Sequence, residues 1–146
     1  VYFSLGEVDL NGIMQSPLVA VGSDGQVMNP ERDSTENVHP RSYGTFPRVL
    51  GRFVREKKLI SLELAVHKMS GLPAKILRLP DRGLIKAGMK ADLAVFNPAT
   101  VIDKADFGNP HQYPEGIPYV FVNGTVAVRD SRLTGAGRGE VLRKKR

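Results

Sequence analysis

The stretch YVFVNGTVAV, residues 119–128, decides the fold of the C-terminal half of the chain. Two runs rich in β-branched and aromatic residues flank the pair Asn123-Gly124. This pair tolerates the positive φ angles of a type I′ turn, which joins antiparallel strands through two residues. We therefore expect a β-hairpin here.

The segment upstream of this hairpin also has β character. GLIKAGMKADLAVFNP, residues 83–98, is punctuated by glycine and lysine and contains an apolar run at residues 93–96, which Asn97-Pro98 closes. This pattern predicts a further strand. Residues 80–146 are thus expected to form a small accessory β domain with a hairpin and a basic tail.

The residues before this β region favour helices. Pro47 is expected near the first position of an amphipathic helix, because a missing N–H costs nothing in a first turn. Ser61 is a suitable N-cap for a second helix, which Gly71 would end. Pro73 then opens a short third helix that reaches Leu77.

Further upstream, residues 18–21 form a continuous apolar run, which is typical of a strand buried on both faces in a parallel sheet. Asp24 would lie at its carboxyl end. Residues 26–43 are polar and follow no period, so they are expected to form a long loop. The order of strand, loop and helices fits the last βα unit of an α/β barrel over residues 1–79, although the pattern is compatible with other α/β arrangements.

Composition restricts the class of protein. The chain has 146 residues, of which 41% are hydrophobic and 25% charged, and it has no cysteine. These values predict a soluble, cytoplasmic protein without disulfides, thiolate metal sites or a membrane partner. Because the sequence begins with Val1 rather than methionine, we expect it to be part of a longer chain.

The net charge of +6 arises largely at the C-terminus. No aromatic residue lies among these basic residues, so a solvated tail is favoured over a nucleic-acid site. The basic residues of this tail are Arg138, Arg143, Lys144, Lys145 and Arg146.

Several longer motifs resemble one family. VGSDG, HPRSYGTFPRVLG, LPAK, DRGLIKAGMKADLAVFNPATV, NPHQYPEGI and VFVNGTVAVRD occur here in the order seen in the D-aminoacylases, the N-acyl-D-amino-acid deacylases of the amidohydrolase superfamily. The resemblance covers nearly the whole chain from Leu18 onward. The segment from Gly88 to Asp92 is shared by many amidohydrolases, whereas HPRSYGTFPRVLG and NPHQYPEGI are much more specific to the deacylases.

The resemblance implies a fold class and a function. It implies an α/β partial fold, in which the last βα unit of a (β/α)8 amidohydrolase barrel is followed by a small accessory β-sheet domain. The implied function is that of a C-terminal fragment of a zinc-dependent enzyme that hydrolyses the amide bond of N-acyl-D-amino acids. Residues 17–24 would be the eighth barrel strand, and Asp24 matches the family's catalytic aspartate.

Asp24 and the loop after it supply the candidate site residues. By pattern alone Ser-Asp-Gly favours a turn, but the family role of Asp24 is general base and then general acid. Arg41 could bind the substrate carboxylate, with His39 and Ser42 beside it. The alternative is that Arg41 fixes the loop and that His39 bonds a backbone carbonyl.

The chain lacks a complete metal site in its sequence. The superfamily binds its metal mainly through histidines of earlier barrel strands, including a His-x-His pair, whereas the three histidines here are all isolated. His67 is therefore interpreted as structural, and His111 as a packing or turn element. Asp24 would be at most a secondary ligand, so zinc is expected in the full-length parent and not on this chain alone, which we predict to be inactive.

Two alternatives remain open from the sequence. One is a fragment of a cyclic-amide hydrolase similar to a hydantoinase or dihydroorotase. The other is a non-catalytic interaction module that keeps only a remnant of the fold. In either case the missing N-terminal barrel, or self-association, would cover the exposed strand edges, and residues 1–41 would be the least secure part in isolation.

Overall fold

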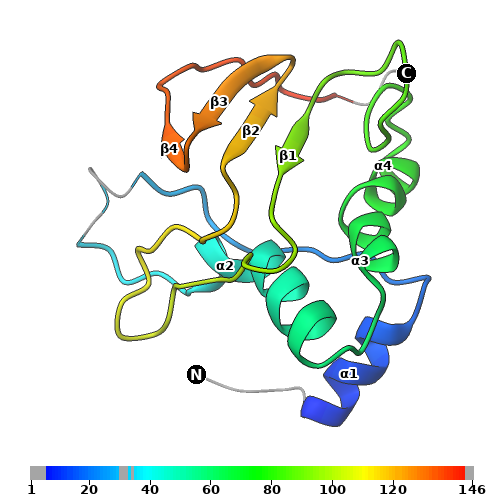
Figure 1. Cartoon of the computed structure of the whole chain (residues 1–146), viewed down its shortest axis with the longest axis vertical. Coiled ribbons are helices and arrows are strands. Elements are labelled where there is room, and N and C mark those ends of the chain that lie inside the picture. Colours follow the sequence, from blue (N-terminus) through cyan, green and yellow to red (C-terminus); the bar gives the residue numbers. More distant parts are fainter. Residues whose placement is uncertain (1–5, 30–32, 34, 144–146) are drawn as a thin grey trace.

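The computed structural model describes residues 6–29, 33 and 35–143. The chain forms helices first and strands afterwards, so that helices and sheet occupy different parts of a mixed α/β unit (Figure 1). Of the predicted basic tail, residues 144–146 lie outside this description. The helices are α1 (Glu7–Gln15), α2 (Arg41–Arg48), the π-helix η1 (Val49–Glu56), α3 (Leu62–Met69) and α4 (Gly71–Leu77).

The strands form an antiparallel sheet in the order β1-β2-β3-β4. They are β1 (Leu93–Val95), β2 (Tyr119–Val122), β3 (Thr125–Arg129) and β4 (Arg132–Leu133). The predicted hairpin is confirmed: Val122 pairs with Thr125, and the φ angles of Asn123 and Gly124 are 48° and 79°. Both angles are positive, as a type I′ turn requires. The predicted strand at residues 93–96 is also present as β1.

The predicted position of Pro47 is wrong. Pro47 lies inside α2, which already begins at Arg41, and the helix continues after it as the π-helix η1. Proline cannot donate to the carbonyl four residues earlier and its ring crowds that carbonyl, so a regular α-helix is disturbed here. Hence residues 41–43, expected in the loop, form the first turn of a helix.

The next two helices agree closely with the sequence. The Ser61 hydroxyl accepts a hydrogen bond from the Leu64 N–H at 3.2 Å, which confirms the predicted N-cap of α3. Pro73 lies in the first turn of α4, which ends at Leu77 as expected. Gly71, however, begins α4 rather than merely ending α3, because the two helices are separated by Ser70 alone.

The predicted strand at residues 18–21 does not form in the described part of the chain. These residues run as irregular backbone, and the Val21 N–H donates to the carbonyl of Lys68 in α3 at 3.0 Å. A strand requires a neighbour that offers a ladder of backbone groups, and α3 offers a single carbonyl. The expected barrel strand is therefore absent, and its place beside α3 is taken by an irregular segment. The helix α1 had no sequence prediction.

The core lies between the helices and the segment that follows β1. Val49, Leu50 and Phe53 of η1 pack with Ala65 of α3 and with Val101, which is fully buried. Close approach is possible because Gly51 and Gly116 lie against Val101: a Cβ on Gly116 would stand 2.6 Å from the Val101 backbone. The core thus joins residues on both sides of the predicted domain boundary at residue 80.

A buried ion pair reinforces this junction. The Asp103 carboxylate, whose side chain is 3% exposed, accepts from Arg48 Nε at 2.8 Å and lies 2.6 Å from Arg48 Nη2. Asp103 also packs against Gly44 of α2, where a Cβ would lie 3.0 Å from the Asp103 Cβ. The ion pair holds α2 in a fixed position relative to residues 101–105.

Candidate active site

Asp24 occupies a left-handed turn at the end of the irregular segment. Its φ angle is 47°, a conformation that aspartate tolerates better than most residues. The next residue, Gly25, donates its N–H to the Ser23 hydroxyl at 3.2 Å. The Asp24 side chain is 84% exposed, and its Oδ2 lies 2.8 Å from Nη2 of Arg41. The structure therefore combines a local turn with an accessible carboxylate that faces a cation.

The segment after Asp24 rests on the first turn of α2. The Gln26 N–H donates to the Ser42 hydroxyl at 3.1 Å. A Cβ on Gly25 would lie 2.9 Å from the Ser42 Cα, so only glycine allows this approach. These contacts bring together Asp24, Arg41 and Ser42, which are separated by a long loop in the sequence.

His39 lies beside the same turn, and among the residues that the structure describes it makes no bond to a backbone carbonyl, which was the alternative to a role in substrate binding. Its Nδ1 accepts from the Arg41 N–H at 3.0 Å, and its ring contacts Phe107 edge to face at 5.0 Å between centroids. Burial lowers the pKa of His39, the charges of Arg41 and Arg48 lower it further, and Asp24 opposes them. His39 is thus expected to be neutral at pH 7.

A cluster that the sequence did not indicate lies next to these residues. The Tyr43 hydroxyl is 3.0 Å from Nδ1 of His111, whose Nε2 is 2.8 Å from the carbonyl oxygen of Glu36. The rings of Tyr43 and Tyr113 also meet edge to face. Burial raises the pKa of Tyr43, as do Tyr113 and Asp33 to a smaller extent. His111 therefore acts as the predicted packing element, but it packs against the candidate site.

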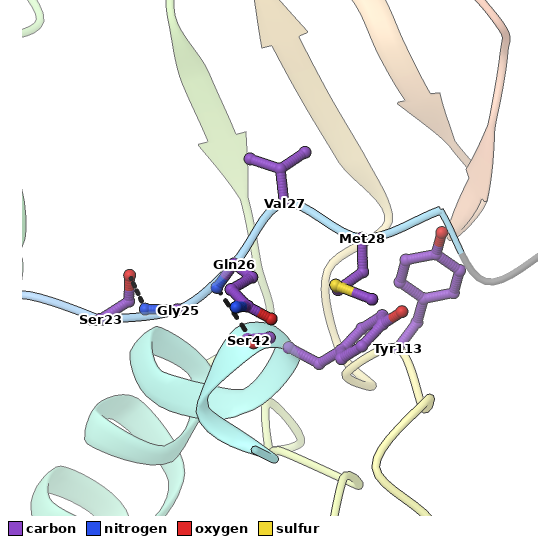
Figure 2. A pocket seen from close by; sticks show the side chains of 8 residues that line it. Ser23, Gly25, Gln26, Val27, Met28, Ser42 and Tyr113 are labelled. Atoms are coloured by element: carbon purple, nitrogen blue, oxygen red, sulfur yellow. Dashed lines mark hydrogen bonds between the residues drawn. The ribbon is translucent and has the colours of Figure 1, made fainter. Parts of the chain in front are cut away.

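A cavity of about 420 Å³ opens between this cluster and the segment after Asp24. Figure 2 shows Ser23 and Gly25 at one end of it, with Met28 and Tyr113 at the other. Ser42 and Gln26 lie between the two ends, joined by their hydrogen bond. Only the fold shows that Tyr43 and Tyr113 line the same cavity, because the motif NPHQYPEGI is more than 60 residues away from HPRSYG in the sequence.

The described residues do not fit a zinc site on their own. Among residues 6–29, 33 and 35–143, no three histidine, cysteine, aspartate or glutamate side chains are close enough to hold a metal ion. His67 lies on α3 against Gly71, far in the sequence from any residue of the candidate site. Within the same residues, no helix has both the length and the apolar character needed to traverse a bilayer.

The sequence matches a family model described as "Amidohydrolase family" over residues 10–128. The chain belongs to the amidohydrolase family. Within this family it is 47% identical to an N-acyl-D-aspartate deacylase of Alcaligenes xylosoxydans xylosoxydans, over 97% of this chain and 27% of that protein. These matches identify the chain as a member of the D-aminoacylase group, which confirms the resemblance found in the motifs.

Two solved amidohydrolase structures resemble this one. A D-aminoacylase mutant in complex with CuCl2 superimposes with a TM-score of 0.88 at 42% identity, over 98% of this chain and 29% of that chain. An N-acyl-D-glutamate deacylase from Bordetella bronchiseptica, complexed with zinc and a phosphonate inhibitor, gives 0.77 at 41% identity, over 86% and 25%. The chain therefore spans little more than a quarter of these amidohydrolases.

A dihydroorotase from Lactobacillus gasseri matches a shorter part of this amidohydrolase. It is 34% identical over 64 residues, which are 42% of this chain and 15% of the dihydroorotase. The similarity to the deacylases thus extends over more than twice as much of the chain.

Proposed function

We propose that this chain is the C-terminal part of a zinc-dependent N-acyl-D-amino-acid deacylase. The observation that supports the proposal best is the placement of Asp24 in a chain of the D-aminoacylase group: its carboxylate is accessible and lies 2.8 Å from Arg41, and its sequence neighbours Ser23 and Gly25 line a cavity. The division into a barrel end at residues 1–79 and a β domain at residues 80–146 remains part of this proposal.

Asp24 is proposed to transfer the proton. Amide hydrolysis requires that the attacking water lose a proton and that the leaving amine gain one, and one carboxylate can accept the first and donate the second. Because the Asp24 side chain is 84% exposed, it can reach a substrate amide. Its turn is fixed by the contacts of Gly25 with Ser23 and Ser42, which keeps the carboxylate at one place.

Arg41, His39 and Ser42 are proposed to bind the substrate. The planar guanidinium of Arg41 matches the α-carboxylate of an N-acyl amino acid. Burial and the charge of Arg41 lower the pKa of His39, which favours its neutral form, so that His39 does not compete with Arg41 for this anion. The Ser42 hydroxyl already accepts from the Gln26 N–H and keeps its own proton available for donation.

Zinc would be held mainly by residues of the full-length protein that are not part of this chain. Asp24 would add at most one carboxylate to those ligands. We therefore propose that the isolated chain is inactive. The whole protein would be metal-dependent and would act on N-acyl-D-amino acids.

The proposal is tested in the full-length protein that contains this chain. Asp24→Asn keeps the size of the side chain and removes its basicity, so kcat for N-acetyl-D-amino acids should fall by about 10²- to 10⁴-fold. Asp9→Asn, an equivalent change on the exposed first turn of α1, should leave kcat unchanged. Zinc content measured on both variants should equal that of the parent, since Asp24 is not a principal ligand.

Retention of more than a tenth of the parent activity by Asp24→Asn would reject the role of Asp24. A full-length protein that hydrolyses dihydroorotate or a hydantoin, and no N-acyl-D-amino acid, would favour the cyclic-amide alternative. A protein that hydrolyses neither class while it binds partners would favour the non-catalytic module.

A further inference from the structure

The imidazole of His111 bridges two points of the chain, one before α2 and one in its first turn. Its Nε2 is 2.8 Å from the carbonyl oxygen of Glu36, and its Nδ1 is 3.0 Å from the hydroxyl of Tyr43. A carbonyl oxygen only accepts hydrogen bonds, so Nε2 carries a proton, and in the uncharged ring Nδ1 then accepts from the Tyr43 hydroxyl. Both ring nitrogens are therefore used to hold the two ends of one segment, residues 36–43.

This bridged segment carries three of the four candidate site residues. His39, Arg41 and Ser42 all lie between the two points that His111 holds. The Arg41 side chain is 44% exposed, and the Asp24 carboxylate that it meets at 2.8 Å is 84% exposed. An ion pair between two exposed side chains contributes little free energy, so it does not by itself fix the guanidinium. The position of Arg41 therefore depends on how its backbone is held.

His111 itself stands on a braced loop, residues 102–115. An antiparallel bridge joins the two ends of this loop. Inside it, the Gln112 side-chain amide donates to the carbonyl oxygens of Lys104 and Asn109, each at 2.9 Å. Figure 1 shows the loop, in yellow, beside the segment that leads into α2. A loop fixed at its base and from within can keep a neighbouring segment in one place.

We propose that His111 is a positioning residue: it holds residues 36–43 so that the Arg41 guanidinium stands where the substrate carboxylate binds. This inference rests on the proposed function, and it gives His111 more than the packing role expected from the sequence. The same loop touches the segment a second time, through the edge-to-face contact of Phe107 with His39. Because the carboxylate is unchanged in the reaction, a displaced Arg41 should weaken substrate binding more than it slows the chemical step.

The test measures kcat and KM of the zinc-loaded full-length protein. Of N-acetyl-D-methionine, N-acetyl-D-aspartate and N-acetyl-D-glutamate, the substrate that the parent hydrolyses fastest is used for every variant. His111→Leu removes both ring hydrogen bonds, so KM should rise by about tenfold while kcat changes by less than about threefold. His111→Gln keeps an N–H donor for the Glu36 carbonyl and should show a smaller rise in KM. His67→Leu is the matched control, since this exposed histidine lies on α3, and both constants should stay within about twofold of the parent.

A double-mutant cycle separates positioning of Arg41 from a general structural role. If His111 acts through Arg41, His111→Leu should lower kcat/KM by less than about threefold in a protein that already carries Arg41→Gln. A larger further loss in that background would overturn the inference. A rise in KM of less than about threefold for His111→Leu alone would overturn it as well.

Tyr43→Phe keeps the inference testable if circular dichroism shows that His111→Leu does not fold. It removes only the hydroxyl from which His111 accepts, so KM should rise by about threefold, and an unchanged KM would overturn the inference. If the parent hydrolyses an N-acetyl-D-amino acid but the variants fail these criteria, the deacylase function stands without this role of His111. If the zinc-loaded parent hydrolyses none of them, the proposed function fails and the inference fails with it.

Discussion

Removal of the Asp103 charge should weaken the whole chain, because this carboxylate joins α2 to the residues after β1. Asp103→Asn keeps the shape of the side chain but converts two charge-assisted contacts with Arg48, at 2.8 and 2.6 Å, into weaker ones. A hydrogen bond to a charged group contributes about 1.5–3 kcal/mol. Breaking a fully buried ion pair costs about 3–5 kcal/mol, but the Arg48 side chain is 45% exposed and can be rehydrated. We therefore expect the free energy of unfolding to fall by about 2 kcal/mol.

Urea denaturation followed by circular dichroism measures this change. With an m-value of about 1–3 kcal/mol/M, the midpoint should shift downward by about 1 M. Arg52→Gln is the matched control, since Arg52 Nε lies 4.0 Å from Asp103 Oδ1 and the Arg52 side chain is 53% exposed. It should change the free energy by less than about 0.5 kcal/mol. A midpoint for Asp103→Asn within 0.2 M of the parent would refute the reasoning.

Two further predictions concern a glycine and a histidine. Gly116→Ala forces a Cβ to within 2.6 Å of the Val101 backbone at a φ of 80°, so the free energy of unfolding should fall by at least about 2 kcal/mol. Gly124→Ala is the control, because Gly124 has a φ of 79° but open space around it, and it should lower the free energy of unfolding by about 1 kcal/mol. Equal losses of stability in the two variants would argue against the packing at Val101. His39 should titrate by NMR below 6.5, because burial and then Arg41 lower its pKa, and Arg41→Gln should move its midpoint upward. Because the pKa of His39 is lower in the folded chain, the unfolded chain takes up the imidazole proton at a higher pH, and the free energy of unfolding should fall as the pH drops below about 6.5. An NMR titration midpoint of His39 at or above 6.5 in the parent would contradict this prediction.

The sequence predicted those elements whose cause lies within a few neighbouring residues. Asn123-Gly124 makes its own turn and Ser61 makes its own cap, so the hairpin and the start of α3 were both found. The barrel strand at residues 18–21 was wrong because a strand depends on a partner elsewhere, and the Val21 N–H of this apolar run donates to the carbonyl of Lys68 in a helix instead. Pro47 misled in a similar way, since the helix around it is stabilised by the core contacts of η1 and not by local preference.

The same distinction between local and long-range causes applies to the residues of the candidate site. Motif similarity made Asp24 a candidate in one motif and His39, Arg41 and Ser42 candidates in a second motif, which follows after a long loop. Tyr113 could not be assigned a place, because its approach to Tyr43 depends on how the residues after β1 return to α2. Only the fold shows that two motifs of the family, far apart in sequence, form the wall of one cavity.

The fully buried Lys68 has a practical consequence for experiments on this chain. Its Nζ donates to the carbonyl oxygens of Ser16 and Ile13, at the end of α1, and burial lowers its pKa. An amine-acylating reagent cannot reach this nitrogen while α1 is in place, whereas the many exposed lysines react at once. The rate at which Lys68 becomes acylated therefore measures how often α1 separates from α3. This side chain can thus serve as a probe for local opening of the N-terminal segment.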